Sequence, residues 1–418
     1  MAQINKASVE NIKNDLENLA KYNSTPGNGI TRVLFYKEEL QGREFIKSRM
    51  IENGMKVRED AVGNIFGNIE GTDPDAAPVW TGSHIDTVLN AGMFDGNAGV
   101  ISGIEALRLI KESGIPHKRN IEAIVYTSEE PTRFGLGCLG SRTMAGELTA
   151  EDMKDIKDKD GLSFAEVLVS LGHNLDEIKD VKRVEGDVHA AVELHIEQGA
   201  VLDTKKIGIG VVTTISAPTD IKVSVFGTQE HAGATPMNMR SDSMSAAAEM
   251  MLGLESLARN SMDYSTVATV GKVMVFPGIT NVIPGQVDFT IDIRSADMDD
   301  KNTLIEKFKE IVKCVESVRS VKTELEIVSH DEPENAEPEI IKMIQDICEE
   351  KSQDYNLMVS GAYHDSMFVS KFAPFGMIFV PSKNGISHHI DEWTDFEDIA
   401  KGTDILAETL LRLSNEEQ

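Results

Sequence analysis

The sequence contains few cysteines and few basic residues, and both shortages exclude classes of protein. Its three cysteines, Cys138, Cys314 and Cys348, are far apart and form no CxxC pair. Neither a disulfide framework nor a cysteine zinc site is therefore indicated. Against 41 lysines and arginines stand 69 aspartates and glutamates, which gives a formal net charge of −28. Because this charge repels phosphates and anionic lipid headgroups, we expect no nucleic-acid or membrane partner.

Long apolar runs, internal repeats and low-complexity tracts are also lacking. No run is long enough to cross a bilayer, and Met1–Tyr22 has the pattern of a polar amphipathic helix rather than a signal peptide. We therefore expect a cytoplasmic protein. The apolar fraction of 41% and the charged fraction of 26% are typical of a globular chain. A length of 418 residues exceeds one ordinary core, so we expect two domains.

The first part of the chain alternates helix-like and strand-like segments. Such alternation predicts an α/β domain with a mostly parallel sheet. The expected helices are Val9–Tyr22, Lys37–Asn53 and Ala98–Glu112, and the expected strands are Val62–Glu70, Val79–Gly82, Ile121–Thr127 and Val188–Ile196.

The pattern changes after Gly208–Gly210. From residue 211 the expected order is strand, helix, strand, strand, helix, strand, which is the βαββαβ order of ferredoxin-like domains. We therefore expect an inserted domain, 211–331, within a catalytic domain formed by 1–210 and 332–418. The inserted elements are Val211–Phe226, Ser241–Arg259, Thr266–Phe276, Gln286–Ser295, Lys301–Val318 and Lys322–Ser329, and the first domain then regains Glu339–Lys351, Gly376–Val380 and Phe396–Leu413.

The stretch Thr81–Gly96 contains a His-x-Asp pair, His84 and Asp86, followed by Asp95. Residues two apart in an extended segment share a face, so the Asp86 carboxylate is expected to take one ring N–H of His84. That arrangement leaves the other ring nitrogen free to bind a metal. Asp95 has two oxygens and can bridge two cations. A lone His-x-Asp pair is more often a solvated turn, so this interpretation depends on further candidates.

Further candidates follow other predicted strands. Glu129 and Glu130 come after one strand, and His195 and His388 come at or after two others. This edge of an open α/β sheet is where ligands bind. Imidazole and carboxylate without thiolate suit zinc, manganese or cobalt. The pattern predicts a two-metal site in which one of the adjacent glutamates ligates and the other acts as general base.

Seven motifs in order resemble the hydantoinase/carbamoylase branch of the dinuclear-zinc aminoacylase and carboxypeptidase family, over essentially the whole chain. They are Gly82-Ser-His84-Ile-Asp86-Thr, Asp95-Gly96, Thr127-Ser-Glu-Glu-Pro-Thr-Arg-Phe-Gly135, Glu193-Leu-His-Ile-Glu-Gln-Gly199, His231-Ala-Gly-Ala-Thr-Pro236, Asp292-Ile-Arg294 and Gly385-Ile-Ser-His388.

This resemblance implies two divalent metal ions and a role for each candidate. Glu129 would be the general base that deprotonates the attacking water, and Asp86 would orient His84. His388 is preferred to His389 because the family's ligand directly follows a serine, here Ser387. By resemblance, one ion would be held by His84, Asp95 and His195, and the other by Asp95, Glu130 and His388.

The resemblance also narrows the reaction. Peptidase members typically carry a carboxylate where this chain has His195, so it implies cleavage of an N-carbamoyl group. Allantoate is the first expected substrate, an N-carbamoyl-L-amino acid the second, and ureidoglycolate a third. The alternatives are a dipeptidase or aminoacylase, and a non-catalytic ureide-binding or scaffolding protein. A binder has no need of a general base such as Glu129.

The resemblance also implies which residues contact the substrate. Some of these residues would come from a partner subunit, so we expect a homodimer that forms through the inserted domain. His231 would stabilise the oxyanion, and Arg294 suits bidentate capture of a carboxylate. One departure is Tyr363, where the family usually has glycine, and it leaves the fine specificity open. The implied substrate-binding residues are Gln198, His231, Asn281, Arg294 and His364.

Overall fold

The computed structural model describes residues 4–416, and its contacts divide the chain into two units. The first unit contains the residues up to Thr213, Ala336–Met358 and the residues from His364 onward. The second contains Thr214–Asn335 and Val359–Tyr363. Its main segment lies close to the expected inserted range.

The short segment 359–363 is a difference from the expected division, which assigned it to the first domain. Within the second unit the N–H of Ser216 donates to the carbonyl of Ser360 at 2.9 Å. Arg294 donates to the carbonyl of Gly361 at 3.1 Å. These long-range hydrogen bonds explain why the segment belongs to the second unit, and no local sequence pattern announces them.

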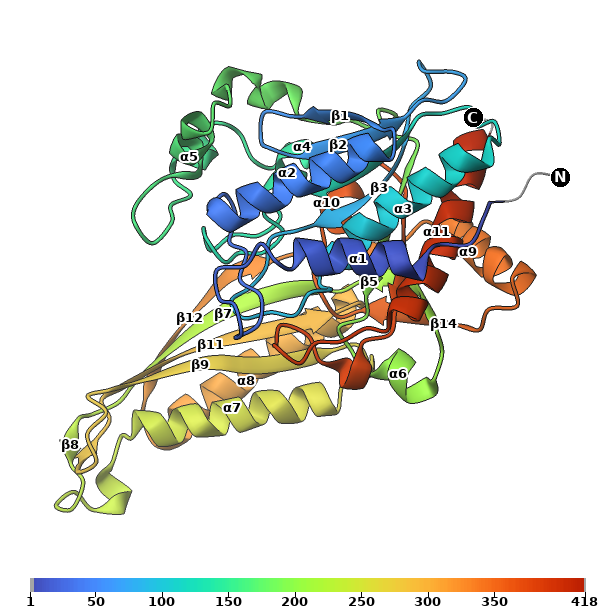
Figure 1. Ribbon diagram of the computed structural model, residues 1–418. Coiled ribbons are helices and arrows are strands. Elements are labelled where there is room, and N and C mark those ends of the chain that lie inside the picture. Colours follow the sequence, from blue (N-terminus) through green and yellow to red (C-terminus); the bar gives the residue numbers. More distant parts are fainter. Residues whose placement is uncertain (1–3, 417–418) are drawn as a thin grey trace. The chain divides into compact units, whose positions relative to one another are not determined.

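A mixed sheet forms the centre of the first unit (Figure 1). Its four central strands, in the order β4-β3-β5-β15, are mutually parallel. On one side β2 pairs antiparallel with β4, and β1 with β2; on the other side β6 pairs antiparallel with β15, and β13 with β6. The expected α/β fold is confirmed, with its parallel pairings at the centre. The strands are β1 Lys56–Glu59, β2 Ile65–Ile69, β3 Val79–His84, β4 Ile121–Tyr126, β5 Ala190–Ile196, β6 Ile209–Ile215, β14 Tyr355–Ser360 and β15 Phe375–Val380.

Helices cover both faces of this sheet, which explains why its central strands are continuous apolar runs. In β4 the side chains of Ile121 and Val125 enter one core, and those of Ile124 and Tyr126 enter the other. The first core is covered by α1 Val9–Leu19, α2 Lys37–Glu52, α3 Asn97–Ser113, α9 Pro338–Glu350 and α11 Phe396–Asn415, and the second by α4 Leu139–Ala145, α5 Phe164–Ser170 and α10 Ser366–Val369.

Parallel central strands have a direct consequence for function. The carboxyl ends of β3, β4, β5 and β15 lie along one edge, and the loops that follow them carry the candidate ligands. The remaining short elements of this unit are α6 Val201–Lys205 and the 3₁₀ turns Asp152–Lys154, Leu175–Asp180 and Lys383–Gly385.

The second unit has a four-stranded antiparallel sheet in the order β12-β7-β11-β9. Alternate residues of β7 and β11 are buried, and they pack against α7 and α8 on one face (Figure 1). The main elements follow the order strand, helix, strand, strand, helix, strand. They are β7 Ala217–Phe226, α7 Ser243–Arg259, β9 Val267–Phe276, β11 Gln286–Ser295, α8 Met298–Arg319 and β12 Lys322–His330, with the shorter β8 Glu230–His231, β10 Val282–Ile283, β13 Glu334–Asn335 and the 3₁₀ turn Met237–Met239.

One element differs from the sequence expectation. Val211–Phe226 was expected to be a single strand, and that prediction is wrong. The structure has two strands, β6 and β7, separated at Ser216. The N–H of Ser216 still donates to Ser360, the last residue of β14, which pairs with β6. Because β6 belongs to the large mixed sheet and β7 to the four-stranded sheet, the strand is interrupted where the chain passes from one sheet to the other.

Candidate metal centre

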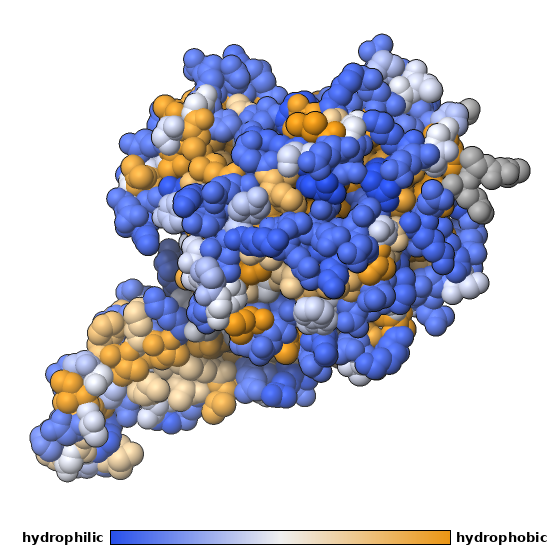
Figure 2. All heavy atoms as spheres, viewed as in Figure 1, coloured by the Kyte–Doolittle hydropathy of each residue, from blue (hydrophilic) through white to orange (hydrophobic). Residues whose placement is uncertain are grey.

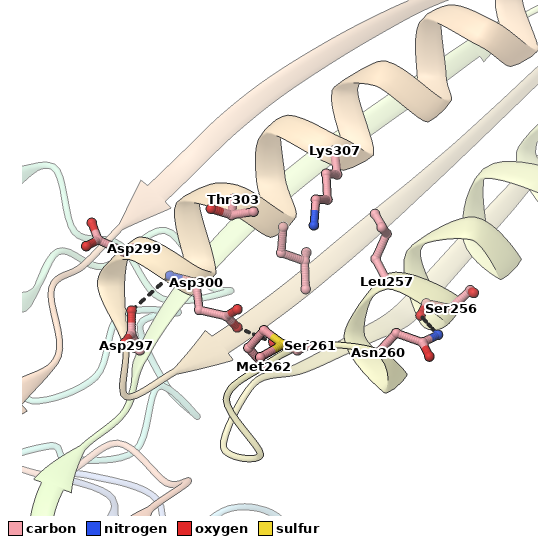
Figure 3. Close-up of a pocket in the computed structure, with 11 residues that line it drawn as sticks. Ser256, Leu257, Asn260, Ser261, Met262, Asp297, Asp299, Asp300, Thr303 and Lys307 are labelled. Atoms are coloured by element: carbon pink, nitrogen blue, oxygen red, sulfur yellow. Dashed lines mark hydrogen bonds between the residues drawn. The ribbon is translucent and has the colours of Figure 1, made fainter.

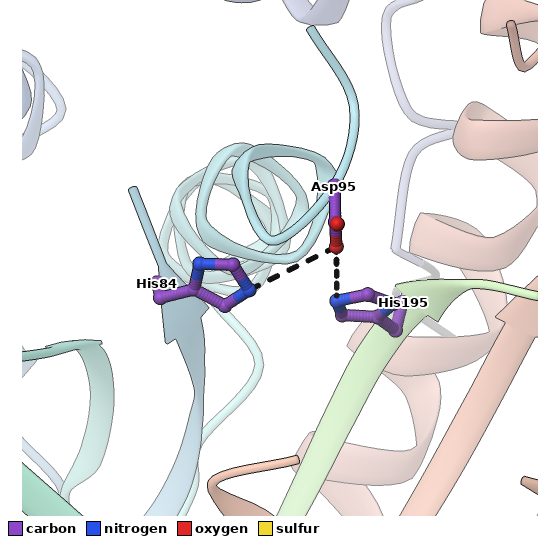
Figure 4. Close-up of side chains that lie close together, drawn as sticks. All are labelled: His84, Asp95 and His195. Carbon is purple, nitrogen blue, oxygen red and sulfur yellow. Dashed lines mark ion pairs between the residues drawn. The ribbon is translucent and has the colours of Figure 1, made fainter. Parts of the chain in front are cut away.

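His84 is the last residue of β3 and is buried. Its Nδ1 lies 3.0 Å from the backbone carbonyl oxygen of Asp86. A carbonyl only accepts, so Nδ1 carries the hydrogen and Nε2 keeps its lone pair. That nitrogen faces Asp95, 3.9 Å from Oδ1 (Figure 4). The ring is therefore fixed in the tautomer that a metal ligand requires.

The expected contact between the Asp86 carboxylate and His84 is wrong in its detail. Oδ1 of Asp86 lies 3.8 Å from Nδ1 of His84, beyond hydrogen-bonding distance. The ring is oriented by the backbone carbonyl of the same residue instead. The Asp86 side chain accepts the N–H of Glu130 at 3.1 Å. Asp86 thus connects the end of β3 to the loop that carries the two adjacent glutamates.

His195, near the end of β5, repeats the geometry of His84. Its Nδ1 lies 2.9 Å from the carbonyl oxygen of Ile196, and its Nε2 lies 3.3 Å from Oδ1 of Asp95. The N–H of Gly96 donates to the same Nε2 at 3.2 Å, so this nitrogen is an acceptor. Nε2 of both histidines therefore faces one carboxylate oxygen, and in the neutral ring this nitrogen has a lone pair (Figure 4).

Gly96 makes the close approach of Asp95 and His84 possible. It has φ +65°, and a Cβ at this position would lie 2.4 Å from Nε2 of His84. No side chain fits in that space, and the left-handed backbone also favours glycine. The Asp-Gly sequence is thus required by the geometry of the cluster.

A second group of candidate ligands lies on the other oxygen of Asp95. Nε2 of His388 is 3.0 Å from Oδ2 of Asp95 and 3.6 Å from Oε1 of Glu130. The amide nitrogen of Gln198 donates to the same Oδ2 at 3.1 Å. The Asp95 carboxylate therefore lies between two groups, His84 with His195 and Glu130 with His388.

Glu129 and Glu130 leave β4 through a turn rather than an extended segment. Ser128 has φ +60°, a left-handed conformation uncommon for serine. Oε2 of Glu129 lies 3.7 Å from Nε2 of His84. Among the described residues, Glu130 belongs to a group of possible metal ligands and Glu129 to none. The two carboxylates are therefore placed differently, and their roles as ligand and base stay predictions.

The cluster contains several buried carboxyl groups whose pKa values are raised, which suits the binding of divalent cations. Burial, with the nearby Asp95 carboxylate, raises the pKa of Glu130 to about 8. Burial, with Glu39, raises the pKa of Asp86 to about 7. Burial and the Glu130 carboxylate also raise the pKa of Glu129 well above its usual value. So many buried acids need compensating positive charge, and two divalent ions bound by the histidines and carboxylates would supply it.

Glu193 is a buried acid of this region that the sequence analysis did not single out as a site residue. It accepts the hydroxyls of Ser83 at 2.8 Å and Ser366 at 2.6 Å. With His195 and His364 it forms a third group of possible ligand atoms. The signal was present in the sequence, because Glu193 and His195 are two apart in one strand and share a face. His364 is buried against His195, with ring centroids 4.6 Å apart.

The other expected substrate-binding residues lie in the second unit. Nδ1 of His231 accepts the N–H groups of Gly233 at 3.0 Å and Ala234 at 3.2 Å, so a neutral ring carries its proton on Nε2. The carbonyl of Asn281 accepts the N–H of Ala232 at 3.0 Å, which joins its loop to the His231 turn. Arg294 donates to Asp292 through contacts of 3.1 to 3.3 Å.

A hollow of about 470 Å³ in the second unit lies between the end of α7 and the start of α8 (Figure 3). Two of its three carboxylates, Asp297 and Asp300, already have structural roles. Asp297 caps α8 by accepting the N–H of Asp300 at 2.9 Å. Asp300 accepts the hydroxyls of Ser261 and Thr266, the latter at 2.7 Å. The acidic lining thus stabilises the start of α8, and we assign it no ligand.

Comparisons with known proteins show what the whole chain resembles. Residues 80–412 match the family described as peptidase family M20/M25/M40. The chain is 40% identical over 409 residues to a ureidoglycolate hydrolase of rice, Oryza sativa subsp. japonica, covering 97% of this chain and 84% of that protein. It is 37% identical to an N-carbamoyl-L-amino-acid amidohydrolase of Paenarthrobacter aurescens, covering 98% and 99% of the two chains.

Two further comparisons extend this likeness. The chain is 33% identical to the allantoate amidohydrolase of Escherichia coli (strain K12), covering 96% of this chain and 97% of that protein. Its fold matches the crystal structure of a hydantoinase/carbamoylase family amidase from Burkholderia multivorans with a TM-score of 0.92, 33% identity and 99% coverage of both chains. Among the residues that the structure describes, no helix is long and apolar enough to cross a membrane.

Proposed function

This chain belongs to the peptidase family M20/M25/M40, and from that membership and its ligand geometry we propose that it is a metal-dependent amidohydrolase of small ureido acids. It hydrolyses the carbamoyl C–N bond of its substrate. The observation that carries the proposal is the Asp95 carboxylate, which lies between two groups of ligands while Glu129 remains outside both. A non-catalytic binder has no use for such a base.

The enzyme uses two divalent metal ions, with zinc, manganese and cobalt as candidates. We assign one ion to His84, Asp95 and His195, and the other to Asp95, Glu130 and His388. When bound, such ions polarise a substrate carbonyl and make water more acidic. In its neutral form each of the two histidines donates from Nδ1 to a backbone carbonyl, which leaves the Nε2 lone pair for the first ion. Burial lowers the pKa of His195, but the contact with Asp95 outweighs burial and raises this pKa to about 9, so the ring releases a proton when the ion binds.

Glu129 takes a proton from the attacking water and then delivers it to the departing nitrogen. Its buried carboxylate, 3.7 Å from Nε2 of His84, supports this assignment. A base that is not itself a metal ligand keeps its lone pairs for the proton. Asp86 holds the Glu129–Glu130 loop through the N–H of Glu130.

His231 and Arg294 recognise the substrate in this proposal. Nε2–H of His231 donates to the oxyanion that develops on the carbamoyl carbon, since its Nδ1 already accepts two backbone N–H groups. A guanidinium has five N–H donors. Asp292 and the carbonyl of Gly361 engage three of those of Arg294. Two donors remain for the substrate carboxylate, and Asn281 and Gln198 contact its polar atoms.

Three ureido acids are candidates for the substrate of this reaction. Allantoate was the first expectation from the sequence, with N-carbamoyl-L-amino acids second. Among the relatives reported above, the one with the highest identity carries the name ureidoglycolate hydrolase, which supports placing ureidoglycolate beside allantoate as a leading candidate. All three substrates share a carboxylate and a terminal ureido group, which are the two features that Arg294 and the metal centre recognise in this proposal.

We also propose a homodimer that forms through the inserted domain, and no nucleic-acid or membrane partner. In the part of the chain that the structure describes, β9 is an edge strand with one paired side. Its exposed Val273 and Phe276, with Leu252 of α7, leave apolar side chains on this unit (Figure 2). An unpaired apolar edge is suited to pairing with a second copy. A cytoplasmic location also remains a prediction, supported by three cysteines that are all free.

The experiment that tests the proposal measures ammonia release from allantoate, ureidoglycolate and several N-carbamoyl-L-amino acids, with metal-replete and metal-stripped protein. A dipeptide and an N-acetyl amino acid in the same panel test the peptidase and aminoacylase alternatives. We expect metal-dependent turnover of at least one ureido acid. Tight binding of a ureido acid without turnover would favour the binding protein, and turnover of the dipeptide alone would favour the peptidase.

A further inference from the structure

Glu392, which the sequence analysis did not single out, joins two loops that carry metal-ligand candidates. Its side chain is 4% exposed. Oε1 accepts the N–H groups of Phe94 at 3.0 Å and Asp95 at 3.1 Å. Oε2 accepts the hydroxyl of Ser387 at 2.8 Å. One carboxylate therefore connects the backbone of the bridging ligand Asp95 to the residue that precedes His388.

The space around Glu392 fits a glutamate closely. A Cβ at Gly92 would lie 2.4 Å from Cβ and 2.5 Å from Oε1 of Glu392, so the chain approaches it as closely as a glycine allows. The N–H of Glu392 donates to the carbonyl of His389 at 3.0 Å, which closes the turn after His388. The carboxylate is thus held in place from both of the loops that it connects.

The two groups of metal ligands differ in what holds them. His84 and His195 lie on β3 and β5, where the sheet fixes their backbones. His388 lies in a loop at φ +54°, and its side chain is 50% exposed. A ligand on an exposed loop in a strained conformation depends on side-chain contacts for its position. The hydroxyl of Ser387, held by Glu392, is such a contact.

Asp95 itself has an additional anchor. Its carbonyl accepts the backbone N–H of Asn97 at 2.7 Å and the side-chain amide of the same residue at 2.8 Å. Loss of Glu392 would therefore leave the Asp95 loop partly held. Among the described contacts, the hydroxyl of Ser387 makes one hydrogen bond, which it donates to Glu392. Loss of Glu392 would therefore remove this contact without a replacement.

We propose that Glu392 is a positioning residue for the ion assigned to Asp95, Glu130 and His388, and that the ion assigned to His84, Asp95 and His195 depends on it far less. The inference rests on the metal centre of the proposed function. Outer-shell partners of metal ligands typically change metal affinity by about 10- to 100-fold when they are removed. We expect a loss of that size for one ion of the pair.

The test titrates the metal-free, full-length protein with Co²⁺ and follows its visible absorption, which reports each ion as it binds. The variants are Glu392→Ala and Ser387→Ala, and the control is Glu397→Ala, an exposed glutamate at the start of α11. We expect both test variants to bind the first equivalent like the parent and the second about 10- to 100-fold more weakly, with Glu392→Ala the stronger effect. The melting temperature of each metal-free variant is measured alongside.

The outcomes separate the inference from its premise. If the parent binds two equivalents and both variants bind both with parent affinity, Glu392 does not position a ligand. If both ions weaken equally and the melting temperature falls, Glu392 is a general structural residue and the inference is wrong. If the parent binds no Co²⁺, the metal centre of the proposed function fails first. Ser387→Ala removes one hydroxyl, so it keeps the test decisive should Glu392→Ala not fold.

Discussion

The carboxylate of Glu129 lies 3.7 Å from Nε2 of His84, the nitrogen that faces the metal centre. A carboxylate this close to a candidate ligand, yet outside both groups of candidate ligands among the described residues, is placed to reach a water between them. In the proposed mechanism this carboxylate supplies the base that a protein which only stores metal would not need. It also makes the role of Glu129 testable apart from metal binding.

Glu129→Gln should retain both metal ions and lose turnover. The amide is nearly the same size but cannot take a proton, and a positioned general base contributes about 10²- to 10⁴-fold to rate. Ammonia release and elemental analysis on the same preparation give the two readouts. The matched control is Glu151→Gln, whose side chain is 80% exposed. Ammonia release near the parent rate would remove Glu129 from the mechanism.

Removal of single ligands should lower metal content and leave most of the first unit folded. His388→Ala is the informative variant, because its neighbour His389 is similarly exposed and belongs to none of the described ligand groups. We expect His388→Ala to lose one ion and most activity, and His389→Ala to keep both ions. Chelation of the parent should abolish activity, and restored metal should return it. Full activity in protein shown by elemental analysis to be metal-free would contradict the two-ion mechanism.

Gly96→Ala should disable the first ion site through a steric clash. The added Cβ would lie 2.4 Å from Nε2 of His84, and the position has φ +65°. Gly114 offers a control with φ +66° and open space around the added atom. Both variants should lose about 1–2 kcal/mol of unfolding free energy from left-handed strain. Only Gly96→Ala should also lose metal, and equal metal contents in the two variants would show that the clash is relieved elsewhere.

The cysteines give a prediction about accessibility. Burial raises the pKa of the Cys348 thiol to about 12 and that of Cys138 well above its usual value. Cys314 is exposed on α8. Because thiolates are the reactive form, a neutral alkylating reagent should label one cysteine in the native protein and three after denaturation. Peptide mapping should find the native label on Cys314, and rapid native labelling of Cys138 would contradict its burial.

Local periodicity predicted more of the fold than of the contacts within the site. Alternating segments implied that several strand ends meet at one edge, so the structure brings together His84, Asp95, His195, Glu130 and His388 from widely spaced positions. Their roles as ligands remain predictions. A carbonyl orients His84 instead of the Asp86 side chain, and backbone acceptors have no signature in sequence.

Glu392 is the clearest example of a site residue that could not be predicted from the sequence. It lies 298 residues along the chain from Phe94, whose N–H it accepts. An isolated glutamate in a turn after His389 is indistinguishable by pattern from the many solvated acids of a chain with 69 of them. Only the folded arrangement shows that this one is buried. The same holds for the break at Ser216, where the chain passes from one sheet to the other.

Arg294→Lys should weaken binding of ureido acids without changing metal content. The guanidinium of Arg294 is a planar fork that holds Asp292 and still has donors for a second carboxylate. Lysine keeps the charge but lacks this fork. Loss of charge-assisted hydrogen bonds costs about 1.5–3 kcal/mol, which corresponds to roughly 10- to 150-fold in kcat/KM. Because the contact is expected in the bound substrate, most of the change should appear in KM.

The control for this change is Arg259→Lys in α7, where the arginine side chain is 75% exposed and pairs with Glu255. Kinetics are compared on a ureido acid and on its amide, which lacks the carboxylate. The parent should prefer the acid, and Arg294→Lys should reduce that preference while Arg259→Lys keeps it. An unchanged preference in Arg294→Lys would mean that another group reads the carboxylate. The inserted domain would then lose its assigned part in substrate recognition, and the metal centre would be unaffected.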